Sequence, residues 1–431
     1  MADVSAATGR GYAAARPGPP AVPRLLRQPA APGLGAHFER FGSLPAATRE
    51  LVAEVQRSGL RGRGGAAFPT AVKMAAVAGR RRPMVVANGT EGEPASAKDK
   101  VLLTAAPHLV IDGAVLAARS VGARQAIICV DRAATSVVTA VGRALAERDR
   151  AGTDPVALRL ATPPGRYVAG EESALVHWFN GGEAKPTLVP PRPYERGVDG
   201  RPTLVQNVET LAHLALIARF GAEWFRSAGT TSDPGSALVT ITGGVALPGI
   251  YEVALGDPLA AVLQAAGTPA TELEAVLIGG YFGSWVPAEA LGALTLDSAS
   301  LSGAGAGLGC GVLAALPRRA CGLAESARVA RWLADQSAGQ CGPCVHGLDA
   351  IAGAMAVLVR GDRDGHALHQ LSRWTAMVRG RGACKHPDGA ARFVESSLRV
   401  FADDIAGHRR RGPCPAARAP LLPTPSQTGW R

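Results

Sequence analysis

The stretch SGLRGRGGAAFPTAVK, from Ser58 to Lys73, has the composition of an anion-binding turn. Gly62, Gly64 and Gly65 leave backbone N–H groups uncovered just before an expected helix, where the helix dipole also favours negative charge. Lys73 lies one turn into that helix and adds a positive charge. A dinucleotide-binding glycine fingerprint follows a strand, whereas this turn follows an expected helix. We therefore expect the turn to bind a phosphate group.

Two further glycine-bearing turns concentrate carboxylates. Glu91 and Glu93 lie in the segment NGTEGEP, and Glu171 and Glu172 lie in YVAGEESAL. Carboxylates accept hydrogen bonds from ribityl and ribose hydroxyls, and they would repel a second phosphate. Taken alone, either turn is better explained as a solvated acidic face or as favourable charge at a helix N-terminus.

Three cysteines have a spacing typical of metal ligands. Cys341 and Cys344 flank a Gly-Pro turn that directs both thiolates to one side, and Cys384 follows downstream. An iron–sulfur cluster, a zinc ion held with an added histidine, and no metal at all are the alternatives. Seven cysteines in 431 residues do not form a disulfide scaffold, which suits a reducing cytoplasm. The cysteines not favoured as ligands are Cys129, Cys310 and Cys414.

The elements that must position these groups alternate between helix and strand in the first half of the chain. Strands are expected at 84–87 and 125–130, and helices at 46–60, 68–78, 108–122, 133–149 and 205–220. Such alternation predicts an α/β layer domain that ends near residue 229. Residues 237–267 then predict a strand, a turn, a second strand and a helix, as in a small β-grasp module. The region 324–408 is helical apart from the cysteine loops.

The ends of the chain carry most of its charge. Segments 1–30 and 405–431 contribute +3 and +5 of the formal net charge of +11. Because no basic stripe interleaved with aromatic residues remains, we expect no nucleic-acid binding. The uncharged run 298–317 is interrupted by glycine and serine, so no membrane span is expected. Residues 1–40 and 409–431 are expected to be disordered tails.

The chain resembles the flavin-binding F subunits of NADH-quinone oxidoreductase (complex I) over about residues 45–405. Four motifs carry the resemblance, in the order of that family: SGLRGRGGAAFPTAVK, NGTEGEP, YVAGEESAL and GRPTLVQNVETLA. The β-grasp unit and the segment AGQCGPCVHG follow in the same order. The resemblance implies an FMN-binding α/β sandwich domain at 41–229, an SLBB-like β-grasp domain at 236–318 and a helical iron–sulfur domain at 324–408.

The resemblance also implies a function and a set of site residues. NADH would be oxidised by FMN, and electrons would leave singly through an iron–sulfur cluster to a partner protein, such as a thioredoxin-like 2Fe-2S subunit or a ferredoxin. The cluster ligands would be Cys341, Cys344 and Cys384. The cofactor-binding residues implied are Gly62, Gly64, Gly65, Phe68, Lys73, Asn88, Glu91, Glu93, Tyr167, Gly170, Glu171, Glu172, Asn207 and Thr210.

The sequence departs from the family pattern at both sites. A second aromatic residue of the NADH site is Ala76 here, and the family's Lys-Pro-Pro-Phe run reads Val189-Pro190-Pro191-Arg192. We therefore expect NADH to bind more weakly than in other family members. The alternatives to NADH oxidation are an FMN-binding subunit that takes electrons from a different donor, such as ferredoxin, and a scaffold without redox function. The first cysteine of the family's cluster motif is Ala338. The cluster would then be 3Fe-4S, or 4Fe-4S with a foreign ligand: Cys321, His346, His386 or water.

Overall fold

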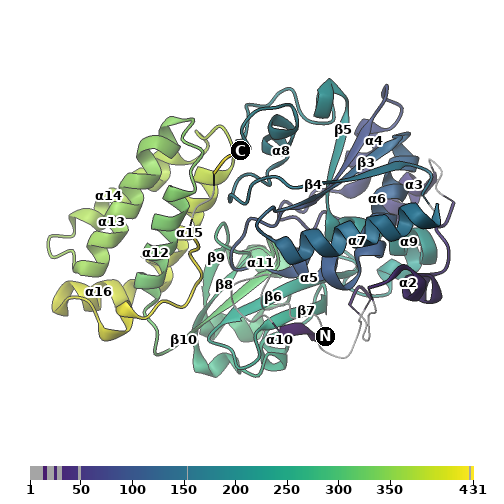
Figure 1. The fold of residues 1–431 in the computed structure, drawn as a ribbon. Coiled ribbons are helices and arrows are strands. Elements are labelled where there is room, and N and C mark those ends of the chain that lie inside the picture. The colour runs from purple at the N-terminus through teal and green to yellow at the C-terminus, as the bar shows by residue number, and fades with distance from the viewer. Residues whose placement is uncertain (1–12, 17–23, 27–31, 47–49, 153, 427–428) are drawn as a thin grey trace.

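A computed structural model shows three units that follow one another along the chain (Figure 1). An α/β unit comes first, a mixed β-sheet follows, and a helical unit comes last. The residues described are 13–16, 24–26, 32–46, 50–152, 154–426 and 429–431.

The first unit is built on a parallel four-stranded sheet in the order β4-β3-β2-β5. The strands are β2 (Met84–Gly89), β3 (Gln125–Val130), β4 (Ala157–Ala161) and β5 (Thr203–Asn207). The two central strands, β2 and β3, read as almost continuous apolar runs because both faces of the sheet are covered.

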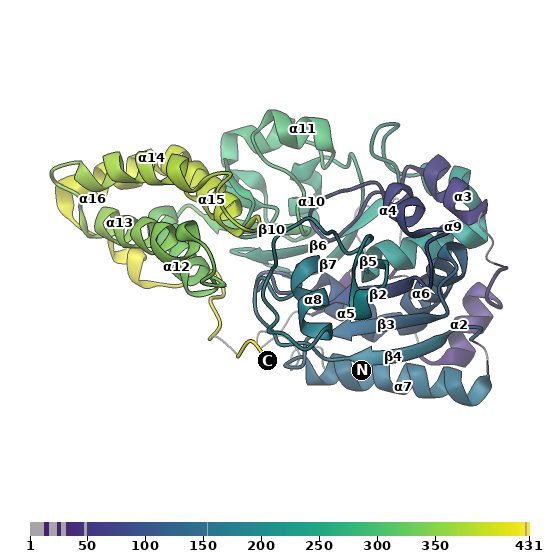
Figure 2. The ribbon, with the colours of Figure 1, turned by 90° about the horizontal axis from the view of Figure 1, so that it is seen from above.

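Helices cover both faces of this sheet. The helices α6 and α9 pack against β2 on one face, and α8 packs on the other through Leu175 and Val176. The helix α7 runs along the edge of the sheet beside β4 (Figure 2). The bounds are α2 (Leu34–Phe41), α3 (Glu50–Ser58), α4 (Thr70–Val77), α5 (Lys98–Ala105), α6 (Pro107–Val121), α7 (Thr135–Ala151), α8 (Glu172–Phe179), the short turn η1 (Val198–Gly200) and α9 (Val208–Arg226).

Several boundaries differ from expectation. The helix expected at 205–220 begins only at Val208, because β5 continues to Asn207, which caps α9 by accepting a hydrogen bond from the Glu209 N–H. Pro69 precedes α4 rather than lying in its first turn. The strand β4 was not expected, since it is a short, half-exposed edge strand without an apolar run.

The second unit is a mixed six-stranded sheet in the order β1-β7-β6-β10-β8-β9. The strand β10 returns parallel to β6, which forms a hairpin with β7, so this is the expected β-grasp arrangement. One face packs on α10, and the other is shared between the first unit and the helical unit. The bounds are β1 (Ala13–Arg16), β6 (Ser236–Gly243), β7 (Gly249–Ala254), α10 (Leu259–Ala265), η2 (Ala270–Glu272), β8 (Leu273–Ile278), β9 (Ser284–Pro287), η3 (Ala288–Ala293), α11 (Ser298–Gly303) and β10 (Val312–Pro317).

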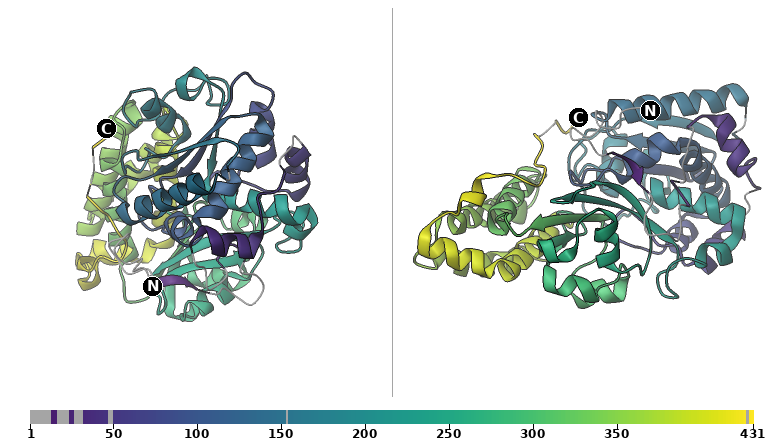
Figure 3. Two further views of the ribbon diagram at one scale, coloured as in Figure 1. Left: turned by 45° about the vertical axis from the view of Figure 1, so that its right-hand side comes forward. Right: turned by 90° about the horizontal axis from the view of Figure 1, so that it is seen from below.

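The third unit is a helical bundle that projects from the second sheet, away from the first unit (Figure 3). The helix α12 packs on α13 and α15, and α15 also contacts β9. The bounds are α12 (Gly322–Asp335), the π-helical turn η4 (Pro343–Gly347), α13 (Leu348–Arg360), α14 (His366–Val378), α15 (His386–Val400), α16 (Ala402–Arg411) and η5 (Pro415–Arg418).

One continuous helical stretch in the described residues, Pro343–Arg360, is long and apolar enough to cross a membrane, with a mean hydropathy of 1.3. The helices α5 and α6 pass the same test if taken together, but they are bent by 96° at their junction. Both stretches pack as core helices within their units, so they are weak indications of a membrane span. The uncharged run 298–317 forms α11, a glycine-rich loop and β10.

The expectation of a disordered N-terminal tail at 1–40 is wrong for its described part. The N–H groups of Arg24, Leu25 and Leu26 donate to Oε2 of buried Glu252 at 2.8, 2.8 and 3.3 Å. The Leu25 side chain is fully buried. The proline and arginine content of the segment suggested disorder, although residues 24–26 are anchored on Glu252. The elements β1 and α2 lie in the same segment. Residues 1–12, 17–23 and 27–31 lie outside the described residues.

The C-terminal tail expected at 409–431 is also ordered where it is described. The N–H groups of Leu421 and Leu422 donate to the buried Glu325 carboxylate at 2.8 and 3.1 Å. The segment then reaches the first unit, where the Trp430 carbonyl accepts a hydrogen bond from the Ala184 N–H at 2.9 Å. The Arg166 guanidinium lies 4.1 Å from the centre of the Trp430 ring. Burial of Leu422 and these polar contacts hold the segment against the protein.

Candidate cofactor and metal sites

The predicted flavin-site motifs meet at the carboxyl ends of β2 and β5. Asn88 and Asn207 are register partners on these adjacent parallel strands. The crevice beyond the carboxyl ends of parallel strands is where α/β sheets bind ligands. Four segments that are far apart in the sequence thus contribute to one place.

The two asparagines join the acidic turns to the strand ends. Asn88 Nδ2 donates to the Gly170 carbonyl at 2.8 Å, and Asn207 Nδ2 lies 3.5 Å from the Asn88 carbonyl oxygen. A Cβ atom at position 170 would lie 2.4 Å from Oγ1 of Thr90, so only glycine allows this approach. The segments NGTEGEP and YVAGEESAL are therefore held together by direct contacts.

The glycine turn is anchored on the first turn of α9. The Arg63 N–H donates to Thr210 Oγ1 at 2.9 Å. A Cβ at position 64 would lie 3.2 Å from the Asn207 Cβ, and Gly65 has a φ of +114°, which disfavours other residues. As the sequence predicted, the turn follows a helix, α3, and not a strand.

Buried Arg63 supplies unpaired donors beside this turn. Its side-chain atoms Nε and Nη2 have no hydrogen-bond partner among the described residues. The acids that act on the guanidinium are Glu209 and Asp233, which line the same cavity as Arg63, so the side chain is directed to the buried charges beneath the turn. A cavity of about 180 Å³ is lined by Arg63, Gly62 and Gly65, but not by the acidic turns.

Lys73 and Glu172 form an ion pair at the same crevice, with Nζ and Oε2 2.7 Å apart. Both side chains are about one-third exposed, at 31% and 28%. The pair joins α4 to the first turn of α8. It places the Lys73 cation, which suits a phosphate, next to the Glu172 carboxylate, which can accept hydrogen bonds from hydroxyl groups.

Glu91 does not point its carboxylate into the crevice. Its oxygens accept hydrogen bonds from Ser96 Oγ at 2.6 Å and from the N–H groups of Asp99 and Lys100, both at 3.1 Å. The carboxylate therefore caps α5, and Lys100 helps hold its pKa low. A cofactor contact from Glu91 would have to come from its main chain, whose φ of +36° is unusual for a non-glycine residue.

Glu93 connects the acidic turn to the second unit. Its carboxylate accepts hydrogen bonds from the Tyr281 N–H at 2.7 Å, the Ala95 N–H at 3.1 Å and Tyr167 Oη at 3.1 Å. Burial raises the pKa of Glu93 to about 7, despite these three donors. Tyr167 also packs edge-on against Phe282 and Trp332, so it lies where the three units meet.

A buried charged cluster under the crevice was not found by the sequence analysis. Lys98 Nζ lies 2.7 Å from Asp99 and 2.8 Å from Glu209, and these acids raise the pKa of Lys98. Asp99 Oδ2 in turn accepts a hydrogen bond from Asn207 Nδ2 at 2.7 Å. The one sequence signal was the acidic pair in NGTEGEP followed closely by the KDK that opens α5.

The face expected to bind dinucleotide is open. Phe68 is 46% exposed and Val189 is 41% exposed. Ala76 is half-buried on α4, and Arg192 is exposed. A single aromatic ring without a facing partner is a weaker platform for adenine than a pair of rings.

The three predicted cysteine ligands lie together at the start of η4 and before α15. Burial, together with the neighbouring Cys341 and Cys384 thiols, raises the pKa of Cys344 to about 11. Glu171, the N-cap of α8, is also close enough to raise the pKa of Cys384. The cysteine site therefore adjoins the acidic turn of the crevice. The buried Ala338 supplies no fourth thiol.

Two of the foreign ligands considered from the sequence do not fit. Cys321 precedes the 14-residue helix α12, whereas Cys341 follows it, so they lie at opposite ends of a helix about 20 Å long. His346 is exposed on η4. His386 directs its Nε2 to the Leu333 carbonyl at 2.8 Å, its ring packs against Tyr167 and Phe282, and its buried Nδ1 has no partner among the described residues. Burial lowers the pKa of His386 to about 4, so the ring is neutral.

A ligand crevice on a parallel sheet, joined through a β-grasp sheet to a helical unit with clustered thiols, defines a flavin- and iron–sulfur-dependent component of an oxidoreductase. Residues 55–216 match the family model of the Nuo51 FMN-binding domain, and residues 324–408 match that of the NADH-ubiquinone oxidoreductase-F iron–sulfur binding region. The chain belongs to the family of F subunits of NADH-quinone oxidoreductase.

The similar proteins extend over most of the chain. The NADH-quinone oxidoreductase F 2 subunit of Rhizobium meliloti is 30% identical over 380 residues, which are 85% of this chain and 90% of that protein. The corresponding F subunit of Streptomyces coelicolor is 32% identical over 386 residues, 86% of each chain. A subunit of an NAD⁺-reducing [NiFe]-hydrogenase superposes with a TM-score of 0.77 at 32% identity. That match covers 88% of this chain and 64% of the hydrogenase chain.

Proposed function

We propose that the chain binds FMN in the crevice at the ends of β2 and β5 and oxidises NADH there. The observation that carries this is the convergence of four motifs on one place, where the glycine turn packs so closely on Asn207 that a Cβ at position 64 would lie 3.2 Å from it. A bound flavin would supply the chemistry that the side chains lack, which is acceptance of a hydride and release of electrons one at a time.

The roles of the residues follow from their contacts. The glycine turn and Lys73 would hold the phosphate, because they offer N–H donors and a positive charge at a helix start. Glu172 would accept hydrogen bonds from hydroxyl groups of the ribityl chain. The Asn88 side chain is already hydrogen-bonded to Gly170 and Thr90, so it would hold the turns together. Glu171 and Glu93 already accept several hydrogen bonds from protein donors, so they would position the turns rather than transfer protons.

Cys341, Cys344 and Cys384 would hold an iron–sulfur cluster beside the crevice, with His386 or water as the fourth ligand. Such a cluster would supply one-electron acceptance. The named relatives are subunits of larger enzymes, which supports an electron-accepting partner, either a 2Fe-2S thioredoxin-like protein or a ferredoxin. All seven cysteines are free thiols, which supports a reducing compartment such as the cytoplasm.

Anaerobic purification and analysis of the full chain tests this function. We expect FMN close to one per chain, iron in the same sample, and bleaching of the flavin absorption on addition of NADH. Protein that retains no flavin after reconstitution with FMN would overturn the proposal.

One observation favours an electron donor other than NADH. The face expected to bind the dinucleotide is open, and Phe68 has no second aromatic ring to pair with because residue 76 is alanine. If NADH leaves the flavin oxidised while reduced ferredoxin bleaches it, the chain is an FMN-binding component that uses a protein donor. If neither donor reduces the bound flavin, the chain is a scaffold.

A further inference from the structure

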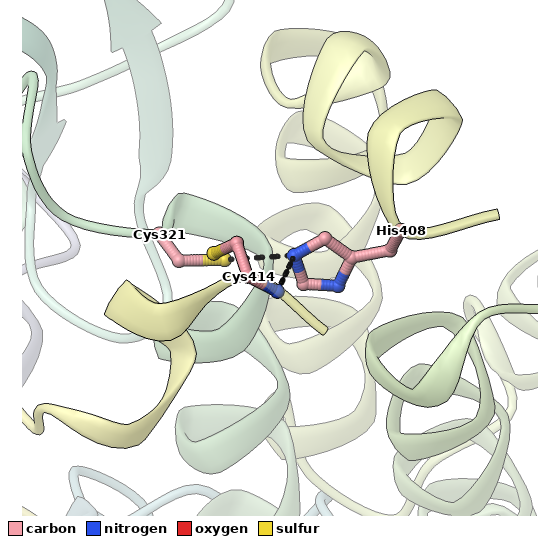
Figure 4. Close-up of side chains that lie close together, drawn as sticks. All are labelled: Cys321, His408 and Cys414. Atoms are coloured by element: carbon pink, nitrogen blue, oxygen red, sulfur yellow. Dashed lines mark hydrogen bonds between the residues drawn. The ribbon is translucent and has the colours of Figure 1, made fainter. Parts of the chain in front are cut away.

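Cys321, His408 and Cys414 form a second cluster of metal-ligand types (Figure 4). Cys321 lies at the opposite end of α12 from Cys341. One ligand atom from each lies within 4.8 Å of the others. Cys321 caps the start of α12, His408 lies in the last turn of α16, and Cys414 precedes η5. Three separate segments of the helical unit thus meet at this cluster.

The distances suit a tetrahedral metal ion. Cys321 Sγ lies 3.6 Å from His408 Nε2. Zinc binds sulfur at about 2.3 Å and nitrogen at about 2.0 Å, so tetrahedral sulfur and nitrogen ligands lie about 3.5 Å apart. A four-iron cluster requires wider spacing, because its ligands surround a cube of metal and sulfide ions.

The orientation of His408 is fixed as it is in metal sites. Its Nδ1 contacts the Val359 carbonyl oxygen at 2.9 Å, which places the ring proton on Nδ1 and leaves a lone pair on Nε2. Nε2 faces the two cysteines and accepts a hydrogen bond from the Cys414 N–H at 3.3 Å, which a bound metal would replace. Metal-ligating histidines are commonly oriented by such a carbonyl.

Asp404 lies beside Cys321 but is not part of the cluster of three. Asp404 lies one helical turn before His408 on α16, and its Oδ2 is 3.7 Å from Cys321 Sγ. The same oxygen accepts a hydrogen bond from the Leu323 N–H at 3.3 Å, which holds the carboxylate at the start of α12. Cys321 and His408 are both only 2% exposed, so a metal here would be largely shielded from water.

We propose that Cys321, His408 and Cys414 bind a zinc ion. Two thiolates and one imidazole match zinc, and Asp404 would have to move closer to His408 and Cys414 to complete a tetrahedral site. The site would be structural because its ligands join three separate segments and two of them are buried. It would fasten the start of α12 to the end of α16 and to the C-terminal segment. That segment continues past Glu325 to Trp430 on the first unit.

Metal analysis of the intact protein, purified anaerobically with a thiol-free reductant, tests the site. We expect about one zinc per chain, distinct from iron. Cys414→Ser and His408→Ala should lower zinc content at least about tenfold. Cys341→Ser should lower iron and leave zinc unchanged, and Cys129→Ala serves as a control for loss of a thiol outside both sites.

Cobalt substitution of the wild-type protein gives a test independent of how the variants fold. Co²⁺ bound here should show the intense ligand-field bands of a tetrahedral thiolate site, together with sulfur-to-cobalt charge transfer. Loss of zinc in Cys341→Ser but not in Cys414→Ser would overturn the proposal by placing zinc on the other three cysteines. A disulfide between Cys321 and Cys414 in the reductant-treated protein, or absence of both zinc and cobalt binding, would overturn it too.

Discussion

Lys73 Nζ and Glu172 Oε2 lie 2.7 Å apart although 99 positions separate them in the chain. An ion pair this exposed contributes at most about 1 kcal/mol to folding. Its significance is its place, since it closes the crevice between α4 and α8 next to the glycine turn. A cation that is paired but still accessible can exchange its partner for a ligand phosphate.

Replacing Lys73 by methionine should weaken FMN binding by roughly 10- to 100-fold, because a hydrogen bond to a charged group contributes about 1.5–3 kcal/mol. Flavin fluorescence titration of the apoprotein measures this. Lys385→Met, at a highly exposed position on the helical unit, is the matched control and should bind FMN as the wild type does. Equal affinity in the two variants would remove Lys73 from the site.

Replacing Gly64 by leucine should abolish FMN retention, because even a Cβ there approaches Asn207 at 3.2 Å and a larger side chain would fill the turn. Flavin content per chain after gel filtration is the readout. Gly353→Leu, on the exposed face of α13 where a Cβ meets nothing within 4 Å, controls for the added bulk. A Gly64→Leu protein with full flavin would contradict the phosphate assignment of the glycine turn.

Restoring an aromatic ring at position 76 should strengthen NADH binding. An aromatic contact contributes about 0.5–1.5 kcal/mol beyond its buried area, so Ala76→Phe should lower the Kd for NADH about 2- to 10-fold. Ala75→Phe places the same side chain on another face of α4 and should leave the affinity unchanged. If both variants respond alike, the gain comes from general hydrophobicity and not from a ring facing Phe68.

Adding a thiol at position 338 should increase iron retention in air, because Ala338→Cys supplies the missing ligand next to Cys341 and Cys344. The wild type should show three-iron paramagnetic resonance signals or lose its iron after exposure to oxygen. Ala338→Ser, nearly the same size but without a thiolate, is the control. No gain in iron from the cysteine variant would mean that another group, such as His386, already completes the site.

Glu93 should make stability fall as pH rises. Its pKa is near 7 in the folded protein against an ordinary value of 4.5, so the folded state keeps a proton that the unfolded chain releases between these values. Relative to Glu93→Gln, the wild type should lose up to roughly 3 kcal/mol of unfolding free energy between about pH 4.5 and pH 7. Urea denaturation at both ends of this window measures the difference. An unchanged difference would show that Glu93 ionises normally.

Much of the crevice could be predicted from local patterns. The apolar runs at Met84 and Gln125 predict buried strands, and the glycine turn after a helix predicts an anion site. Proximity of Asn88 to Asn207 follows only from the parallel register of β2 and β5, which no local sequence pattern shows.

Other features have no local sequence signal. The direction of the Glu91 carboxylate depends on a left-handed backbone conformation, which is unusual for glutamate. The cluster of Cys321, His408 and Cys414 forms because α16 folds back across the start of α12. These residues are far apart in the sequence, so no local pattern predicts that they lie together. The proline and arginine content of the two terminal segments led to a prediction of disorder, although their described parts are ordered.

The anchoring of Arg24, Leu25 and Leu26 on Glu252 bears on how the protein is made. These residues leave the ribosome early, but the carboxylate that binds their N–H groups is synthesised 226 to 228 positions later. The N-terminal segment therefore lacks the Glu252 carboxylate as a hydrogen-bond partner while the whole first unit is synthesised. The segment can dock on the second sheet only late in biosynthesis. Slow translation of the region around Glu252 would prolong the exposure of Leu25 to chaperones and proteases.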